Sequence, residues 1–276
     1  MQPWFIACLL LLGAFSGFSA GLLGIGGGAL MVPFLTMLFT AQHFPSLHVL
    51  HMAVATSLST VLFTSLSSVR AHHYRGAVLW RVVQLMGLGG FLGTLIGAQV
   101  ASHIKTPWLA LIFAGFIAYT AIKMLAAKPA IGEVTAPLPE ALSLFTAGSM
   151  AGIFSSMVGA GGGFVTVPYL RSHNVVIHQA LGTSAAIGFP IAAGGLLGYA
   201  IAGFNLHEAL PVHSLGFIYL PALMCLAGVS VFFAPLGART AHALNVKALQ
   251  RIFSGLLMML ASYMLYKSLN TFGFVA

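Results

Sequence analysis

The stretch GLLGIGGGALMVPFL, residues 21–35, has a pattern that GAGGGFVTVPYL, residues 159–170, repeats. Each stretch places a cluster of glycines before a short apolar run that contains Val-Pro. A glycine inside a helix costs about 1 kcal/mol relative to alanine, so each cluster predicts an interruption of a helix. The composition of the rest of the sequence indicates whether these interruptions lie in water or in a membrane.

The composition is that of a membrane protein. Of 276 residues, 59% are hydrophobic and only 5% are charged, whereas soluble domains carry about a quarter charged residues. Apolar stretches close to the roughly 20 residues of a membrane-spanning helix recur along the whole chain. They cover residues 4–23, 49–69, 82–101, 108–126, 142–158, 180–204, 215–233 and 252–266. The sequence therefore predicts an all-α polytopic membrane protein with 8 to 10 membrane segments.

The second half of the sequence repeats the first. A shift of 135 residues places Gly24 on Gly159, and the match continues along the chain with small changes of register. A stretch rich in proline, with two of the three acidic residues, separates the halves. We expect a first membrane repeat at residues 1–127, a cytoplasmic linker at 128–140 and a second membrane repeat at 141–276.

The lysines and arginines indicate how the halves are oriented, because such residues concentrate in cytoplasmic loops. With four crossings in each half, they divide almost evenly between the two sides. If the short segments after the glycine clusters count as returning passes, each half has five crossings. With the N-terminus outside, only Lys105 and Lys267 then lie outside. The cytoplasmic group is Arg70, Arg75, Arg81, Lys123, Lys128, Arg171, Arg239, Lys247 and Arg251. We therefore expect an inverted-topology repeat, in which the short segments either cross fully or are re-entrant.

The glycine clusters are the candidate binding site. Irregular backbone at membrane depth survives only where it is buried in protein or lines a wet cavity. Free N–H groups at the start of a helix, together with its dipole, attract an anion, and broken helices at matching positions of two halves are typical of transporters. The candidate substrate-binding glycines are Gly24, Gly26, Gly27, Gly28, Gly159, Gly161, Gly162 and Gly163, with Pro33 and Pro168 as helix-breaking prolines.

Two hydroxyl pairs lie near these clusters. Thr56-Ser57 and Thr183-Ser184 occupy matching places in apolar spans of the two halves. Hydroxyl groups can donate to anionic oxygens without burying a charge, so we add all four residues to the candidate binding site. Alternatively, they bond to carbonyls one turn back in their own helices. Many other glycines, such as Gly93/Gly97 and Gly194/Gly198, are expected to let helices approach closely.

Other kinds of site lack the residues that they need. The net charge of +8 comes from scattered cations, not from a basic face that would bind nucleic acid. GIGGGA lacks the preceding strand and the acidic residue of a dinucleotide site. Cys8 and Cys225 lie in apolar spans without CxxC spacing, and the histidines show no metal-ligand spacing. We therefore expect no cofactor and no metal.

Carboxylates are expected only in loops, at Glu133, Glu140 and Glu208. Coupling to protons or sodium through an intramembrane acid is therefore not expected. His51 and His178 could titrate or could serve as structural histidines at helix ends. The apolar N-terminus ends in GFSA as a signal peptide does, but it belongs to the repeat and we expect it to remain.

The paired motifs GLLGIGGGALMVP and SSMVGAGGGFVTVP, followed by HMAVATSL and HQALGTSA, resemble the TauE/SafE family of bacterial membrane proteins. The resemblance covers nearly the whole chain. It implies a permease of the bacterial cytoplasmic membrane that exports sulfite, sulfonates or related sulfur-containing anions. The glycine motifs and both Thr-Ser pairs match the family pattern without departure.

We expect a transporter that exports a small sulfur-containing anion by alternating access between the two repeats. Its partners would be that anion and the lipid bilayer, with no nucleic acid, and homo-oligomerisation stays open. Import of such an anion is the closest alternative. An intramembrane enzyme would need a nucleophile paired with a base or a metal, and a non-transporting scaffold would leave the doubled interruption without a reason.

Overall fold

The computed structural model describes residues 2–23, 27–126, 139–204, 206, 210–240 and 246–271. These residues form ten α-helices and one short β-hairpin. The first five helices are α1 (Pro3–Leu23), α2 (Gly28–Ala41), α3 (Val49–His73), α4 (Trp80–His103) and α5 (Thr106–Ala126). The others are α6 (Ala141–Val158), α7 (Gly163–Ser172), α8 (Ile177–Ala202), α9 (Leu220–Thr240) and α10 (Val246–Thr271). The prediction of a helical membrane protein is confirmed, and each of the eight long apolar stretches lies wholly or mostly in one helix.

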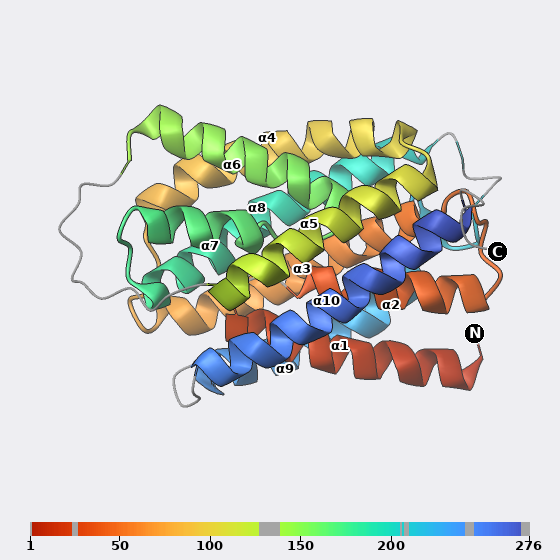
Figure 1. The fold of residues 1–276 in the computed structure, drawn as a ribbon, viewed down its shortest axis with the longest axis horizontal. Helices are drawn as coiled ribbons and strands as arrows, with labels where there is room; N and C mark the ends of the chain where they lie inside the picture. Colours follow the sequence, from red (N-terminus) through yellow and green to blue (C-terminus); the bar gives the residue numbers. More distant parts are fainter. Residues whose placement is uncertain are drawn as a thin grey trace.

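Seven helices, α1, α3–α6, α8 and α9, are long and apolar enough to cross a membrane. Helices α2 and α7 have only 14 and 10 residues, or about 21 and 15 Å at 1.5 Å per residue. A hydrocarbon core is about 30 Å thick, so neither short helix can cross it alone. Both begin near the middle of the bundle and run to opposite ends (Figure 1).

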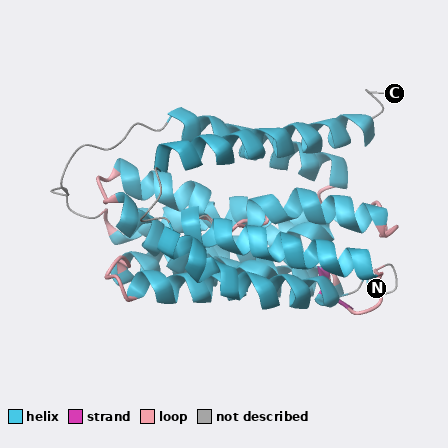
Figure 2. Ribbon diagram, turned by 90° about the horizontal axis from the view of Figure 1, so that it is seen from below, coloured by secondary structure: helices cyan, strands magenta, loops and turns pink. Residues whose placement is uncertain are grey.

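The packing of the first five helices is matched by that of the last five. Helix α1 packs against α9 as α6 packs against α4, and α3 packs against α9 as α8 packs against α4. The fifth helices, α5 and α10, pack against each other. In Figure 2, α10, which leads to the C-terminus, lies in a layer with α5 on one side of the bundle. Each half therefore contributes the same set of helices to equivalent contacts.

Glycines let several of these helices approach closely. A Cβ atom added to Gly93 would overlap the backbone of Ser149 on α6, and one added to Gly194 would overlap that of Phe91 on α4. At Gly198 a Cβ would lie 2.7 Å from the Cβ of Ala98. The predicted role of these small residues in helix packing is confirmed.

Two expectations from the sequence are wrong. The apolar stretch 215–233 does not begin as a helix, because Ser214–Leu215 and Ile218–Tyr219 pair as antiparallel strands β1 and β2. Pro33 and Pro168 do not break helices, since α2 and α7 continue through them. Each proline is the sixth residue of its helix, so the missing N–H leaves a first-turn carbonyl without its usual donor. The expected linker lies almost entirely outside the described residues, which end at 126 and resume at 139.

Candidate functional site

Two glycine turns begin the short helices. Gly27, before α2, has a left-handed backbone with φ 65°, and Gly162, before α7, has φ 77°. Gly159, which follows α6, has φ 70°. L-residues with side chains rarely adopt this region, so glycine is required at these positions. Neither Gly27 nor Gly162 provides a side-chain cap for the N–H groups that follow. Gly24 and Gly26 lie outside the described residues.

The two turns meet in the middle of the bundle. Gly28 lies so close to Gly159 that a Cβ on Gly28 would overlap the Gly159 carbonyl oxygen. The hydroxyl of Ser57, which is fully buried, lies 3.1 Å from the carbonyl oxygen of Gly28 and 2.8 Å from that of Gly159. Since carbonyls only accept, Ser57 donates its hydrogen to this junction. The start of α2 and the end of α6, over 100 residues apart in the chain, are thereby held together by α3.

The threonines of the two hydroxyl pairs make matching bonds across the halves. The backbone N–H of Tyr219, just before α9, donates to Thr56 Oγ1 at 3.1 Å. The backbone N–H of Leu79, just before α4, donates to Thr183 Oγ1 at 3.0 Å. Each threonine thus satisfies an N–H at the start of a helix of the other half, which is where helices leave N–H groups without internal partners.

The fourth hydroxyl belongs to Ser184, whose Oγ lies 2.7 Å from Thr166 Oγ1 on α7. These bonds of the pairs reach beyond their own helices, and the predicted role of these hydroxyls in anion binding stays a prediction. Ser57, Thr56 and Thr183 bond to the backbone of other segments, and Ser184 bonds to a neighbouring helix. These bonds position the short helices and the junction.

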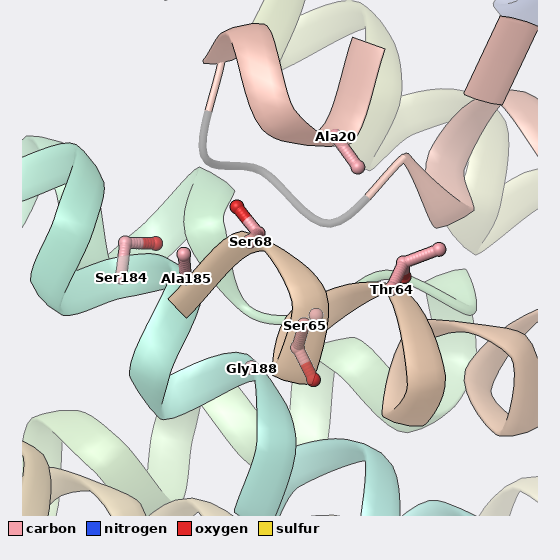
Figure 3. Close-up of a pocket in the computed structure, with 8 residues that line it drawn as sticks. Ala20, Thr64, Ser65, Ser68, Ser184, Ala185 and Gly188 are labelled. Atoms are coloured by element: carbon pink, nitrogen blue, oxygen red, sulfur yellow. The ribbon is translucent and has the colours of Figure 1, made fainter. Parts of the chain in front are cut away.

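A small cavity lies beside the turn that precedes α7. Its volume is about 10 Å³, which is room for about one water molecule. Side chains of α1, α3 and α8 surround it (Figure 3), and Gly161 of the turn before α7 completes the lining. The lining residues are Ala20, Thr64, Ser65, Ser68, Gly161, Ser184, Ala185 and Gly188. We call this space the central cavity.

Among the described residues, one side-chain hydroxyl in this wall has no hydrogen-bond partner. The side chain of Ser68 is only 2% exposed, and its Oγ is buried without a partner. By contrast, Ser65 donates to Leu62 O at 3.0 Å and Thr64 lies within 3.3 Å of carbonyls of its own helix. A buried hydroxyl without a partner costs about 1–3 kcal/mol, so a polar guest in the cavity would offer the Ser68 hydroxyl a favourable hydrogen bond.

The central cavity brings together two of the predicted site residues, Gly161 and Ser184. The sequence analysis did not single out Ser68. The available signal was the helical spacing of hydroxyl residues at positions 57, 60, 64 and 68, which places them on one face of α3. His51 is a structural residue here, because its Nε2 lies 3.0 Å from Ile104 O and 3.2 Å from Ala101 O at the end of α4. Among the described residues, no three His, Cys, Asp or Glu side chains come together as metal ligands.

Comparisons with known proteins agree with this architecture. The sequence profile described as "Sulfite exporter TauE/SafE" matches residues 9–264. A probable membrane transporter protein of Haemophilus influenzae is 34% identical over 263 residues, covering 95% of this chain and 99% of that protein. One from Bacillus subtilis is 30% identical, covering 72% of this chain and 79% of its own. One from Methanocaldococcus jannaschii is 25% identical, covering 93% of this chain and 94% of its own.

No solved structure matches the chain. The family match spans nearly the whole sequence, and seven described helices can cross a membrane. The relatives named above carry the same description as membrane transporters. The chain therefore belongs to the sulfite exporter TauE/SafE family and is a multi-pass membrane transporter.

Proposed function

We propose that this transporter exports a small sulfur-containing anion, such as sulfite or a sulfonate, across a bacterial cytoplasmic membrane. The observation that carries the proposal is the central cavity, where the unpartnered hydroxyl of Ser68 lies beside the glycine turn before α7. The first N–H groups of a helix and its dipole favour a negative charge at that position. A hydroxyl and backbone N–H groups would together bind anionic oxygens without a buried cation.

The cavity as it stands holds about one water, so an anion requires it to open. We propose alternating access, in which one repeat rocks against the other around the junction of Gly28 and Gly159. The Gly28 backbone meets the Gly159 carbonyl there, the Ser57 hydroxyl bonds to both carbonyls, and the buried side chain of Val32 packs against Gly159. Parting of the two segments would therefore break the Ser57 bonds and separate this small apolar contact.

The inverted orientation of the repeats belongs to the same proposal. Each half has five helices, an odd number that would reverse the second half in a membrane. The reciprocal bonds of Thr56 and Thr183 support this arrangement, as do the opposite directions of α2 and α7. Such a repeat provides two equivalent conformations, open to either side.

Export of an anion needs no coupling ion. An inside-negative potential favours outward movement by about 2.3 kcal/mol per charge for every 100 mV. Of the three acidic residues, the structure describes only Glu140, which precedes α6 at an end of the bundle. We propose that the membrane potential and the anion gradient drive the flux.

The first prediction concerns orientation. Helices α3, α5, α7 and α9 end at the end of the bundle where α4, α6, α8 and α10 begin (Figure 1). Arg81 and most of the cations lie at that end, and Lys105 lies at the other. In a Cys8→Ala/Cys225→Ala background, we expect an impermeant maleimide to label Lys105→Cys on intact cells and Arg81→Cys only after lysis. The opposite pattern would refute the topology.

The second prediction concerns the substrate. Liposomes that contain the purified protein and radiolabelled sulfite, sulfate or sulfoacetate should release label faster than protein-free liposomes, and an interior-negative potential should accelerate release. Flux that responds only to an inward gradient in oriented vesicles would favour import. The absence of flux of all three anions would reject the proposal and leave a scaffold or an enzyme as the remaining interpretations.

A further inference from the structure

A second, larger cavity opens where α3 and α9 end side by side. Its volume is about 480 Å³, within the range of about 300–1,000 Å³ that is typical of ligand pockets. The described residues that line it are Ser67, Arg70, Ala71, Tyr74, Arg75, Pro235 and Arg239. We call it the arginine cavity.

The wall of this cavity is fixed by two bonds between α3 and α9. Pro235 has no N–H, so the carbonyl of Val231, four residues earlier, loses its usual helical donor. The hydroxyl of Ser67 donates to that carbonyl at 2.7 Å and replaces the lost bond. Arg75 donates from an Nη atom to the carbonyl oxygen of Ala238 at 3.2 Å. The cavity is thus a defined feature of the helix packing.

The charge of the cavity is strongly one-sided. Its described lining includes three guanidinium groups and no carboxylate. The guanidinium of Arg70 lies 5.9 Å from the centre of the Tyr74 ring, and the Arg75 guanidinium is held by α9. Repulsion among three cations that face one space is relieved when an anion binds between them.

We propose that the arginine cavity is a binding site for a small dissolved oxyanion. Guanidinium groups present planar pairs of N–H donors that match the oxygens of such anions. The Arg75 guanidinium is bonded to α9 before any anion arrives, which lowers the entropy cost of binding at that group.

The site has a defined relation to the central cavity. Ser67 lines the arginine cavity and the next residue, Ser68, lines the central cavity. The two spaces therefore lie on neighbouring faces of the same turn of α3. An anion held by the arginines would lie against the helix that also lines the central cavity, and in this proposal the site collects the transported anion. That collecting role rests on the proposed function, whereas the binding itself does not.

The test measures the binding of sulfate to the purified full chain in phosphatidylcholine nanodiscs at low ionic strength. The variants are Arg70→Gln/Arg75→Gln/Arg239→Gln, and Arg81→Gln as a control that removes an exposed charge at the same end outside the cavity. Each guanidinium contributes roughly fivefold at a water-exposed contact distance. We expect the triple variant to bind about 100-fold more weakly, and Arg81→Gln to bind like the wild type. Added salt should weaken binding to the wild type.

Three outcomes would overturn the site: no sulfate binding to the wild type, equal binding to the triple variant, or loss of binding in Ser68→Ala alone, which would assign the anion to the central cavity. If phosphatidylglycerol added to the nanodiscs abolished sulfate binding, the cavity would hold a lipid phosphate and its collecting role would be refuted. Retained binding in a protein that shows no flux would instead reject the proposed function and leave this site intact.

Discussion

Replacing Gly28 with alanine is expected to reduce anion flux to less than about a tenth of the wild-type value and to lower the free energy of unfolding. The added Cβ would overlap the carbonyl oxygen of Gly159 and approach the Cα of Ala160 to 3.0 Å. These are backbone atoms of a turn fixed by Ser57, so no side chain can rotate out of the way. Overpacking of this kind costs about 1–3 kcal/mol or more, and relief requires the two turns to separate.

The measurement is efflux from liposomes together with thermal unfolding of the purified variant. Gly115→Ala on α5 and Gly255→Ala on α10 are the matched controls, because a Cβ at either position meets nothing within 4 Å. Both are helical, so alanine should leave flux unchanged and raise stability slightly. Wild-type flux in Gly28→Ala would show that the junction of the two turns is not needed for transport.

The membrane helices and the two interruptions could be predicted from the sequence because both have local causes. Hydropathy alone separates the long helices from their connections, since hydrocarbon penalises every charge. Glycines at 27, 159 and 162 adopt left-handed backbone that ends or begins a helix within a few residues. The hairpin before α9 has a weaker signal, the single Gly216 at its turn, and its strands run directly into the apolar helix that follows.

The partners of the hydroxyl pairs could not be predicted. Ser57 bonds to a carbonyl 102 residues away, and Thr56 accepts from an N–H 163 residues away. Such contacts form only when the bundle assembles, so they cannot be predicted from the neighbouring sequence. The repeated positions of the pairs were visible in the sequence, and in the structure Ser57 bonds at the junction of Gly28 and Gly159.

Ser68 was overlooked for a related reason. In sequence it is one of several hydroxyl residues in α3, and most of these bond to carbonyls of their own helix, as Ser59 and Thr60 do. Only the packed structure distinguishes the hydroxyl that lacks a partner. Ser68 lines the same cavity as Gly161 and Ser184, which the sequence analysis had placed in the candidate binding site.

Replacing Ser68 with alanine is expected to raise the KM for the transported anion by about ten- to a hundredfold, because a hydrogen bond to a charged group contributes about 1.5–3 kcal/mol. Thermal stability should stay the same or rise, since the variant removes a buried hydroxyl that has no partner in the folded protein. A purely structural serine would have the opposite signature, with reduced stability and an unchanged KM.

Ser59→Ala is the matched control for this measurement. Ser59 lies on the same helix and is fully buried, but its hydroxyl donates to the carbonyl of Ala55 at 2.8 Å. It does not line the central cavity, so we expect its replacement to leave the KM within about twofold of the wild-type value. If Ser68→Ala retained the wild-type KM in liposomes while both proteins folded normally, the anion would bind elsewhere and the central cavity would be only a packing defect. An increase in KM confined to Ser68→Ala would instead place the anion beside Ser68 and the glycine turn before α7, in the central cavity once that cavity has opened.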